Sequence, residues 1–410
     1  MQNWGEFRTG WKIVLSAAVG IGTSLTTLVF YSTGVLMPAL SRAFGWSDPA
    51  IMASLTIVLL GASLLGPPIG LLADRIGSRP VVLASVALLG LAWLFMALNT
   101  GSLVLFYVLV VVLTVAGAGT LPVTWTRAVI RHFVHRRGAA LGLCLVGTGV
   151  FGILVKQLSF HLLQVAGWRG AYAGIGALLL LVTWPIAWLG YREPAAADAG
   201  RRLVEPGLEL AQAARTRQFW TLVAGFFLLS VSIAGIAPNL ERFLTRQGFG
   251  LAAAVDVASA YGLGIIVGRV LTGLSLDRFW APAVIFVMLC PAVLTYVVLG
   301  HGSVTATEAG IAVFIVGSAS GVEYDALSFL VARYFGRRAY SAIYGCIYIG
   351  FAVGAGLGPY VFTRMVGATG GYGPVMNLTA LVLAAAILLL LTLGRYPARH
   401  PAPIAQEVSP

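Results

Sequence analysis

Long apolar runs are the feature that most constrains this chain. Twelve can be counted along the 410 residues, and most approach the roughly 20 residues that an α-helix needs to cross a bilayer. Only 10% of the residues are charged and 59% are hydrophobic, whereas soluble chains carry about 25% charge. We therefore expect an all-α membrane protein and no enzyme activity. The runs lie near residues 12–36, 49–72, 80–98, 102–127, 139–163, 169–190, 218–240, 252–276, 281–300, 305–331, 340–363 and 372–394.

The chain divides into two similar halves. The longest polar stretch, residues 192–217, separates the sixth run from the seventh. The sequence GLLADRIG at Gly70–Gly77 recurs as GLSLDRFW at Gly273–Trp280, about 200 residues later. Such internal repeats are typical of transporters whose substrate site lies between the halves. We predict two pseudo-symmetric bundles of six helices, at 1–191 and 218–410, joined by a cytoplasmic linker.

The net charge of +12 is explained by topology. If both termini are cytoplasmic, eighteen of the 26 lysines and arginines lie in inside loops and five in outside loops. Positive charge is concentrated in cytoplasmic loops of membrane proteins. The sequence therefore predicts a multi-pass protein of a bacterial inner membrane, with a lipid bilayer and no nucleic acid as its partner.

Neither a metal nor a nucleotide is expected to bind. Cys144, Cys290 and Cys346 stand alone in apolar runs, without the paired spacing of a metal site. A phosphate-binding loop of the form GxxxxGK[ST] is absent from the sequence. We predict no cofactor, and transport that is not driven by ATP.

The loop after the second run carries a recognisable motif. It reads GLLADRIGSRP, and it resembles the Gly-x-x-x-Asp-Arg-x-Gly-x-Arg loop of the major facilitator superfamily. The resemblance implies twelve transmembrane helices, transport by alternating access, and a gate at the cytoplasmic side. The residues that match the gate motif are Gly70, Asp74, Arg75, Gly77 and Arg79, with Gly273, Asp277 and Arg278 in the degenerate second copy.

Three further stretches are similar to the monocarboxylate transporter and oxalate:formate antiporter branch. They are RHFVHRRGAALGLCLVGTGVFG, GWRGAY and GRVLTGLSLDR. The resemblance implies that Arg269, in the eighth run, binds the carboxylate of the substrate. The aspartate that the monocarboxylate carriers place one turn earlier is Ile265 here. The lysines of the two groups align with Tyr31 and Phe351, so one of the usual two cations is missing, which disfavours a small dianion. The isoleucine at position 265 removes the usual proton-coupling aspartate.

Arg269 is also conspicuous on physical grounds. A charge deep in a transmembrane span costs about 2.5–3.5 kcal/mol even on lenient scales, so it has to face protein, water or a ligand. A guanidinium stays ionised when buried and binds a carboxylate through two parallel hydrogen bonds. Arg269 is thus either a receptor for an anion or the partner of a buried carboxylate.

Lys156 lies in the outer half of the fifth run, near the face formed by Gly149 and Gly152. It is either a second cation for the substrate, a partner for a carboxylate on another helix, or a lysine that reaches the outer interface. Glu323 and Asp325 lie inside the tenth run, where carboxylates are functional candidates. Two positions apart on a helix, they point in different directions. We expect one to face the centre and carry the proton, with Glu323 preferred, or both to serve a structural network.

Other polar candidates lie nearby in the sequence. Arg127 is about one turn from the inside loop and is assigned to the cytoplasmic gate rather than to the substrate site. Tyr31, Tyr344 and Tyr348 fall in the first and eleventh runs, which line the cavity in the family that the chain resembles. Their hydroxyls either hold the substrate or simply pack.

The sequence therefore predicts a secondary transporter of a small organic anion, a monocarboxylate in the first instance. Proton-coupled symport is preferred because two carboxylates lie within the membrane. The alternatives are an anion exchanger without proton coupling and an exporter of drugs or toxic anions. The expected partners are the organic anion, protons and the bilayer, and the carrier is expected to function as a monomer.

Overall fold

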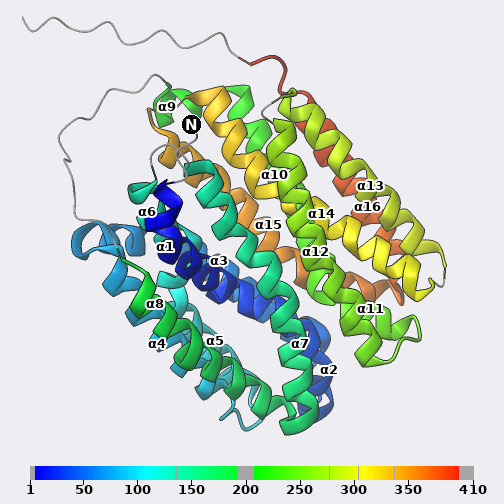
Figure 1. Cartoon of the computed structure of the whole chain (residues 1–410). Helices are drawn as coiled ribbons and strands as arrows, with labels where there is room; N and C mark the ends of the chain where they lie inside the picture. Colours follow the sequence, from blue (N-terminus) through cyan, green and yellow to red (C-terminus); the bar gives the residue numbers. More distant parts are fainter. Residues whose placement is uncertain are drawn as a thin grey trace, which may run out of the picture.

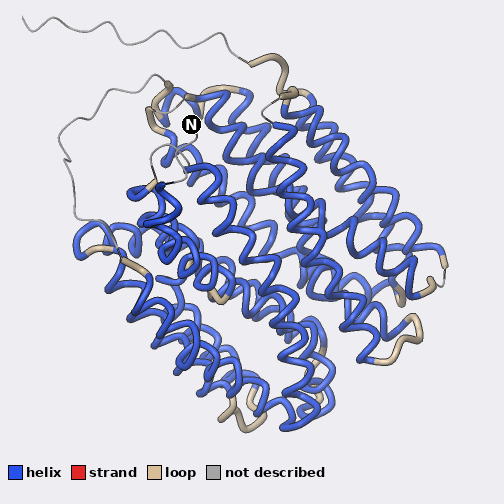
Figure 2. The backbone as a smooth tube through the Cα atoms, in the orientation of Figure 1, coloured by secondary structure: helices blue, strands red, loops and turns tan. Residues whose placement is uncertain are grey.

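The computed structural model describes residues 5–133, 137–192, 207–276, 278–302, 304–336 and 338–396. All regular secondary structure in these ranges is helical, apart from a single antiparallel bridge between Gly207 and Gly336 (Figure 2). The helices are α1 (Gly5–Gly22), α2 (Leu25–Phe44), α3 (Asp48–Ile76), α4 (Ser78–Met96), α5 (Leu103–Gly117), η1 (Ala118–Thr120), α6 (Pro122–His132), α7 (Arg137–Leu178), η2 (Leu179–Thr183), α8 (Trp184–Gly190), α9 (Leu210–Ala213), α10 (Arg217–Ile236), η3 (Ala237–Asn239), α11 (Leu240–Arg246), α12 (Leu251–Leu276), α13 (Ala281–His301), α14 (Ala306–Phe335), α15 (Tyr340–Thr369) and α16 (Tyr372–Leu391).

The predicted number of twelve spans agrees with these helices once two interruptions are taken into account. Ten helices of the described part are long and apolar enough to cross a membrane, and the bent pair α1–α2 supplies an eleventh span. One of the ten runs from Ala140 to Gly190, which is 51 residues and too long for one crossing. It is divided at Gly167, where φ is 67° and the chain reverses, a backbone conformation that glycine adopts without steric cost.

The helices form two bundles that lie side by side (Figure 1). The first half contacts the second mainly through α7 with α12, α3 with α15, and α2 with η3 and α11. We call the end where residues 192, 207 and 396 lie the linker end, and the opposite end the far end. Residues 193–206, within the predicted linker, lie outside the described part, and the remainder of that stretch includes the short helix α9.

Tight glycine packing holds α12 against α14. A Cβ added to Gly264 or Gly268 of α12 would overlap the backbone of α14 at Ser318. A Cβ at Gly317 or Gly321 of α14 would in turn overlap the backbone of α12. Small residues four positions apart let membrane helices approach closely. This seam fixes the position of Arg269, which follows Gly268, relative to the carboxylates that follow Gly321.

The halves are packed together toward the far end and separate toward the linker end. Gly149 of α7 and Gly262 of α12 have no room for a Cβ, because each lies against the other helix. Gly142 and Gly273 lie on the same faces closer to the linker end, and a Cβ there would meet open space among the described residues. The interface between α3 and α15 shows the same pattern. Gly356 of α15 lies against α3, whereas Gly70 of α3 and Gly345 of α15, closer to the linker end, have open space among the described residues. The halves are therefore in close contact at the far end and farther apart at the linker end.

Candidate functional site

Arg269 lies at the centre of the candidate site. It is 9% exposed, and its Nε and Nη1 atoms are buried without a hydrogen-bond partner among the described residues. Buried polar atoms are nearly always hydrogen-bonded in folded proteins, so each exception calls for an explanation. Unpaired N–H donors on a buried guanidinium can be satisfied by an anion such as a carboxylate.

Two carboxylates of α14 lie within electrostatic reach of Arg269. Asp325 is the closer, with 3.9 Å between its Oδ1 atom and Nη1 of Arg269, and it is 26% exposed. Glu323 is 4% exposed, interacts with the charge of Arg269, and has a buried Oε1 atom without a hydrogen bond. Both carboxylates thus interact electrostatically with Arg269, and which of them faces the centre stays a prediction.

An aromatic cluster borders the same guanidinium. Arg269 lies over the ring of Tyr324, 5.6 Å from its centroid, an arrangement that favours a cation. The Tyr324 ring contacts Tyr348 and Phe351 of α15, and Tyr348 stacks on Tyr344. The predicted tyrosines of the eleventh run therefore lie beside the site. Tyr31, from α2 of the other half, lies close enough for a Coulombic interaction with Arg269 and Glu323.

Lys156 forms a buried ion pair with Glu241 of α11. The lysine is 1% exposed and the glutamate 0%, which rules out the alternative in which Lys156 reaches the membrane interface. The ammonium also lies 6.0 Å from the centroid of the Tyr31 ring. Lys156 belongs to the first half and Glu241 to the second, so the pair joins the two halves, as the alternative of a carboxylate on another helix predicted.

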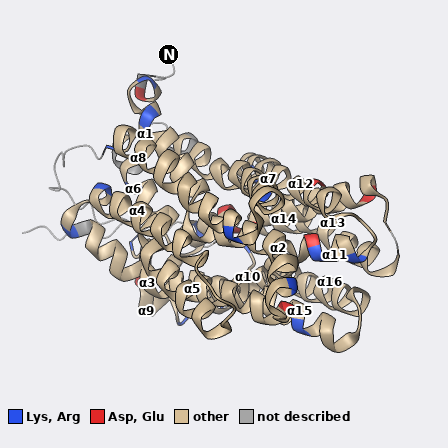
Figure 3. Ribbon diagram, turned by 90° about the horizontal axis from the view of Figure 1, so that it is seen from below, with Lys and Arg blue, Asp and Glu red and all other residues tan. Residues whose placement is uncertain are grey.

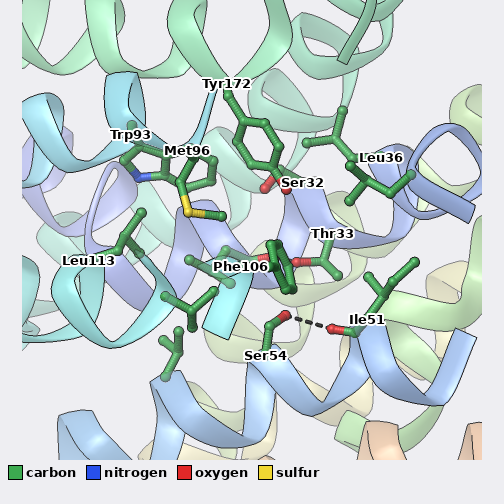
Figure 4. A pocket seen from close by; sticks show the side chains of 14 residues that line it. Ser32, Thr33, Leu36, Ile51, Ser54, Trp93, Met96, Phe106, Leu113 and Tyr172 are labelled. Carbon is green, nitrogen blue, oxygen red and sulfur yellow. Dashed lines mark hydrogen bonds between the residues drawn. The ribbon is translucent and has the colours of Figure 1, made fainter. Parts of the chain in front are cut away.

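The cavity drawn in Figure 4 lies inside the first bundle and is a different feature. Ser32 and Thr33 of α2 and Ser54 of α3 point into it, beside Trp93 and Tyr172. Its volume is about 20 Å³, roughly the space of one water molecule. Its lining includes no charged residue, so it does not fit an organic anion.

The residues of the loop motif lie at the linker end. Gly77 has a φ of 90° and separates α3 from α4, which agrees with the predicted tight turn. Arg79 donates a hydrogen bond to the backbone of Trp188 in α8 at 2.9 Å, whereas Arg75 and Arg278 are exposed. Arg127 is half-buried on α6. Asp277 and the side chain of Asp74 lie outside the described part, so the predicted latch stays a prediction.

Two residues of the site were not singled out from the sequence. Glu241 directly follows the end of the seventh apolar run, a position where a charged residue is ordinary. In the structure the helix does not end there, because η3 connects α10 to α11, which contains Glu241. The need of the buried Lys156 for a partner was the available signal. Tyr324 stands between the two carboxylates, but an aromatic residue in an apolar run gives no signal of its own. Charged positions are sparse along the helices (Figure 3), so these pairs stand out only in three dimensions.

The sequence is similar to those of known membrane carriers. The sequence model described as Major Facilitator Superfamily matches residues 19–359. An uncharacterized 38 kDa protein encoded in the 23S RNA operon of Thermoproteus tenax is 28% identical, and the match covers 90% of this chain and 92% of the relative. Monocarboxylate transporter 13 of Bos taurus is 26% identical, with 94% and 90% covered.

Comparison with solved structures supports the fold. A bacterial homologue of the human lysosomal transporter Spinster, solved in an inward-facing and occupied conformation, superposes with a TM-score of 0.69. The match covers 96% of this chain and 97% of that structure, at 17% identity. This similarity concerns the fold, which is that of twelve-helix transporters.

Proposed function

This chain belongs to the major facilitator superfamily of membrane transporters, and we propose that it carries a small organic anion, a monocarboxylate in the first instance. The observation that carries the proposal is Arg269, a buried guanidinium between the halves whose nearest carboxylate is 3.9 Å away and whose Nε and Nη1 atoms lack a hydrogen-bond partner in the described part of the chain. Similarity to monocarboxylate transporters across most of the chain supports the same substrate class.

In this proposal, the substrate carboxylate binds the guanidinium fork of Arg269. The apolar part of the substrate packs against Tyr324, Tyr344 and Tyr348, whose rings line one side. Tyr31 approaches from the other half and offers a hydroxyl. A single cation at this position suits one carboxylate better than two, because a second carboxylate would be buried without a counter-charge.

Proton coupling follows from the carboxylates beside Arg269. Protonation of Asp325 or Glu323 would remove a competing negative charge and leave the guanidinium for the substrate. Proton and anion together add no net charge to the site, so the loaded carrier can change conformation without moving charge through a low-dielectric region. We therefore propose symport, in which one proton accompanies each anion.

The proposed location is the bacterial inner membrane, with both termini in the cytoplasm. The excess of arginines in the loops of the linker end supports this orientation. Residues 192–217 then form the cytoplasmic linker between the halves at 1–191 and 218–410. The end at which the halves separate would then face the cytoplasm.

The decisive experiment is uptake into proteoliposomes that contain the purified carrier. Radiolabelled acetate, L-lactate, pyruvate and oxalate are offered, with and without a pH gradient that is acidic outside. We expect a monocarboxylate to accumulate only with the gradient, and oxalate to be a poor substrate. The assay is repeated with Arg269→Ala, with Arg269→Lys, and with Arg364→Ala as a control for an exposed arginine of α15.

The alternatives give different results in the same assay. An anion exchanger would take up label only when the vesicles contain unlabelled substrate, and the pH gradient would add nothing. Normal uptake by Arg269→Ala would overturn the assignment of Arg269 as the receptor. A protein that transports none of the four acids, but exports a cationic dye, would overturn the substrate class.

A further inference from the structure

Two consecutive residues of α11 connect the second half to the first at the far end. Glu241 forms the buried pair with Lys156 of α7. Arg242 forms a second pair with Asp48 at the start of α3, with 2.9 Å between Nε and Oδ2. The polarity of the two pairs is opposite, since the first half supplies the cation in one and the anion in the other. Such alternation fixes the register of two surfaces, because a shifted contact would bring like charges together.

The buried pair is built into the interface between the halves. A Cβ on Gly34 of α2 would overlap Oε2 of Glu241, and a Cβ on Gly152 of α7 would overlap the ring of Tyr31. These two glycines therefore provide the space in which Glu241 and Tyr31 lie. Only Oε1 of Glu241 meets the lysine, while Oε2 is buried without a hydrogen bond among the described residues.

The pair has to separate when the far end opens. Alternating access requires the halves to part at this end, and Lys156 and Glu241 belong to different halves. Separation of a buried ion pair is strongly unfavourable unless each charge finds a new partner or is neutralised. An anion and a proton meet that requirement together, because the anion compensates the lysine and the proton neutralises the glutamate.

We propose that Lys156 and Glu241 form a charge-exchange gate, which opens when Glu241 takes a proton and Lys156 takes the carboxylate of the incoming substrate. The proton comes from water at the far side and is bound by the Glu241 carboxylate. When the halves close again, the ion pair re-forms, the proton passes from Glu241 inward to Asp325 or Glu323 beside Arg269, and the substrate is displaced from Lys156 toward Arg269. This inference rests on the proposed function, since it takes the substrate to be a carboxylate.

Other features of the far end fit this role. A surface depression of about 370 Å³ lies outside the gate, and Arg42 and Arg242 are among its lining residues. Basic residues at the mouth of a cleft raise the local concentration of anions. On the inner side, Tyr31 is the link to the central site, because it lies over Lys156 and also interacts with Arg269 and Glu323. Tyr31 thus lies between the gate residue Lys156 and the receptor Arg269.

The ionisable groups around Glu241 come from several elements. Lys156 of α7 is its partner, and the ring of Tyr31 on α2 lies beside the lysine. Tyr261 of α12 packs against Tyr31, with 6.3 Å between the ring centroids. Arg242, the next residue of α11, is engaged with Asp48 of α3. A far-side proton therefore meets Glu241 in a setting where Lys156 is the one cation in direct contact among the described residues.

The first part of the test measures opening of the far end directly, by chemical labelling and not by transport. The native cysteines at 144, 290 and 346 are replaced, and Ser259→Cys is introduced as a reporter. Ser259 lies in the closed interface, where it accepts a hydrogen bond from Gln157 of α7. Labelling by a membrane-impermeant maleimide from the far side then reports opening, and Arg364→Cys, at an exposed position near the far end, normalises for protein amount.

We expect Glu241→Gln to label the reporter faster by about tenfold, because loss of one charge shifts the population toward the open state. Lowering the far-side pH in the presence of acetate, L-lactate or pyruvate should accelerate labelling in the otherwise unchanged chain. The double variant Lys156→Gln/Glu241→Gln should label at a rate that no longer depends on pH. Equal labelling of Glu241→Gln and the unchanged chain would overturn the gate.

The second part measures coupling in proteoliposomes with the same three monocarboxylates. We expect Glu241→Gln to lose accumulation driven by the pH gradient while exchange against internal substrate continues. The double variant is expected to lose it as well. If the double variant instead recovers gradient-driven uptake, the pair only ties the helices together, and the charge-exchange proposal is wrong.

The two parts separate this inference from the proposed function. If Glu241→Gln opens the far end but no monocarboxylate is transported by the unchanged chain, the substrate class fails and the charge-exchange step fails with it, whereas the gate remains. If monocarboxylates accumulate normally in Glu241→Gln, the proposed function stands and the charge exchange is overturned.

Discussion

The two buried cations of this protein are held in opposite ways. Lys156 is in direct contact with Glu241, whereas Arg269 has its nearest carboxylate at 3.9 Å and two N–H donors that form no hydrogen bond with the described residues. Burial is similar, at 1% and 9% exposed. The two cations therefore differ in whether their polar groups have partners, and not in how deeply they are buried. The chain itself supplies the partner of Lys156, whereas in our proposal the substrate supplies the partner of Arg269.

The position of each cation explains the contrast. Lys156 lies at the closed far end, where its ion pair with Glu241 joins α7 to α11 across the interface. Arg269 lies farther toward the linker end, where the faces of α7 and α12 begin to separate. In this state the contacts at the far end are formed, whereas the proposed substrate receptor, Arg269, still lacks a close partner.

The largest effect is expected at the unsatisfied cation. Arg269→Ala should lower uptake by at least about 100-fold, because a charged partner of the substrate is worth roughly 2–5 kcal/mol in a buried site. The variant should remain folded, since the ion pair of Arg269 with Asp325 is long, at 3.9 Å, and no shorter one occurs within the described ranges. Uptake of radiolabelled substrate and the melting temperature of the purified carrier are the two measurements. A variant that melts far below the unchanged protein would indicate that Arg269 is structural, like Lys156.

Arg269→Lys sharpens the same comparison. It keeps the charge but loses the fork that makes two parallel hydrogen bonds. We expect an intermediate loss of about tenfold in apparent affinity, with the maximal rate less affected. Saturation kinetics of uptake give both values. Equal affinity in the two proteins would show that charge alone, without guanidinium geometry, holds the substrate.

The two cations also differ in how far the sequence could predict them. Arg269 stood out because it interrupts an apolar run, and its role followed from a resemblance in the surrounding GRVLTGLSLDR. Lys156 stood out for the same reason, but Glu241 did not, since it follows the end of its run. Pairing across 85 positions in the sequence is a property of helix packing. The order of closeness of Asp325 and Glu323 to Arg269 likewise depends on the glycine seam between α12 and α14.

The twelve spans and the two halves were predictable because hydrophobic length and the repeated GLLADRIG motif are local properties of the chain. The closed far end was not, because one sequence has to adopt both states of the transport cycle. The break between α1 and α2 also went unpredicted. The apolar run continues across Thr23 and Ser24, and hydropathy does not respond to a bend of 42°.

A medium effect on stability is expected at the satisfied pair. Lys156→Met or Glu241→Gln alone should destabilise the carrier by roughly 3–5 kcal/mol, because each leaves the other residue of the pair as a buried charge without a partner. The charge-reversed double variant Lys156→Glu/Glu241→Lys should recover part of that loss. Thermal unfolding in detergent, followed by tryptophan fluorescence, measures the series. Additive losses in the double variant would mean that the two residues do not stabilise each other.

The smallest effect is expected at the outer pair of α11. Asp48 and Arg242 are 15% and 29% exposed at their side chains, and pairs that water reaches contribute only about 0–1 kcal/mol. Asp48→Asn should therefore leave the melting temperature nearly unchanged and reduce uptake by less than about twofold. Raising the salt concentration should produce a similar small change in the unchanged protein, because exposed pairs are screened by ions. A loss as large as that of Glu241→Gln would show that the two neighbouring pairs act as one unit, and that the far-end gate extends from Lys156 to the surface.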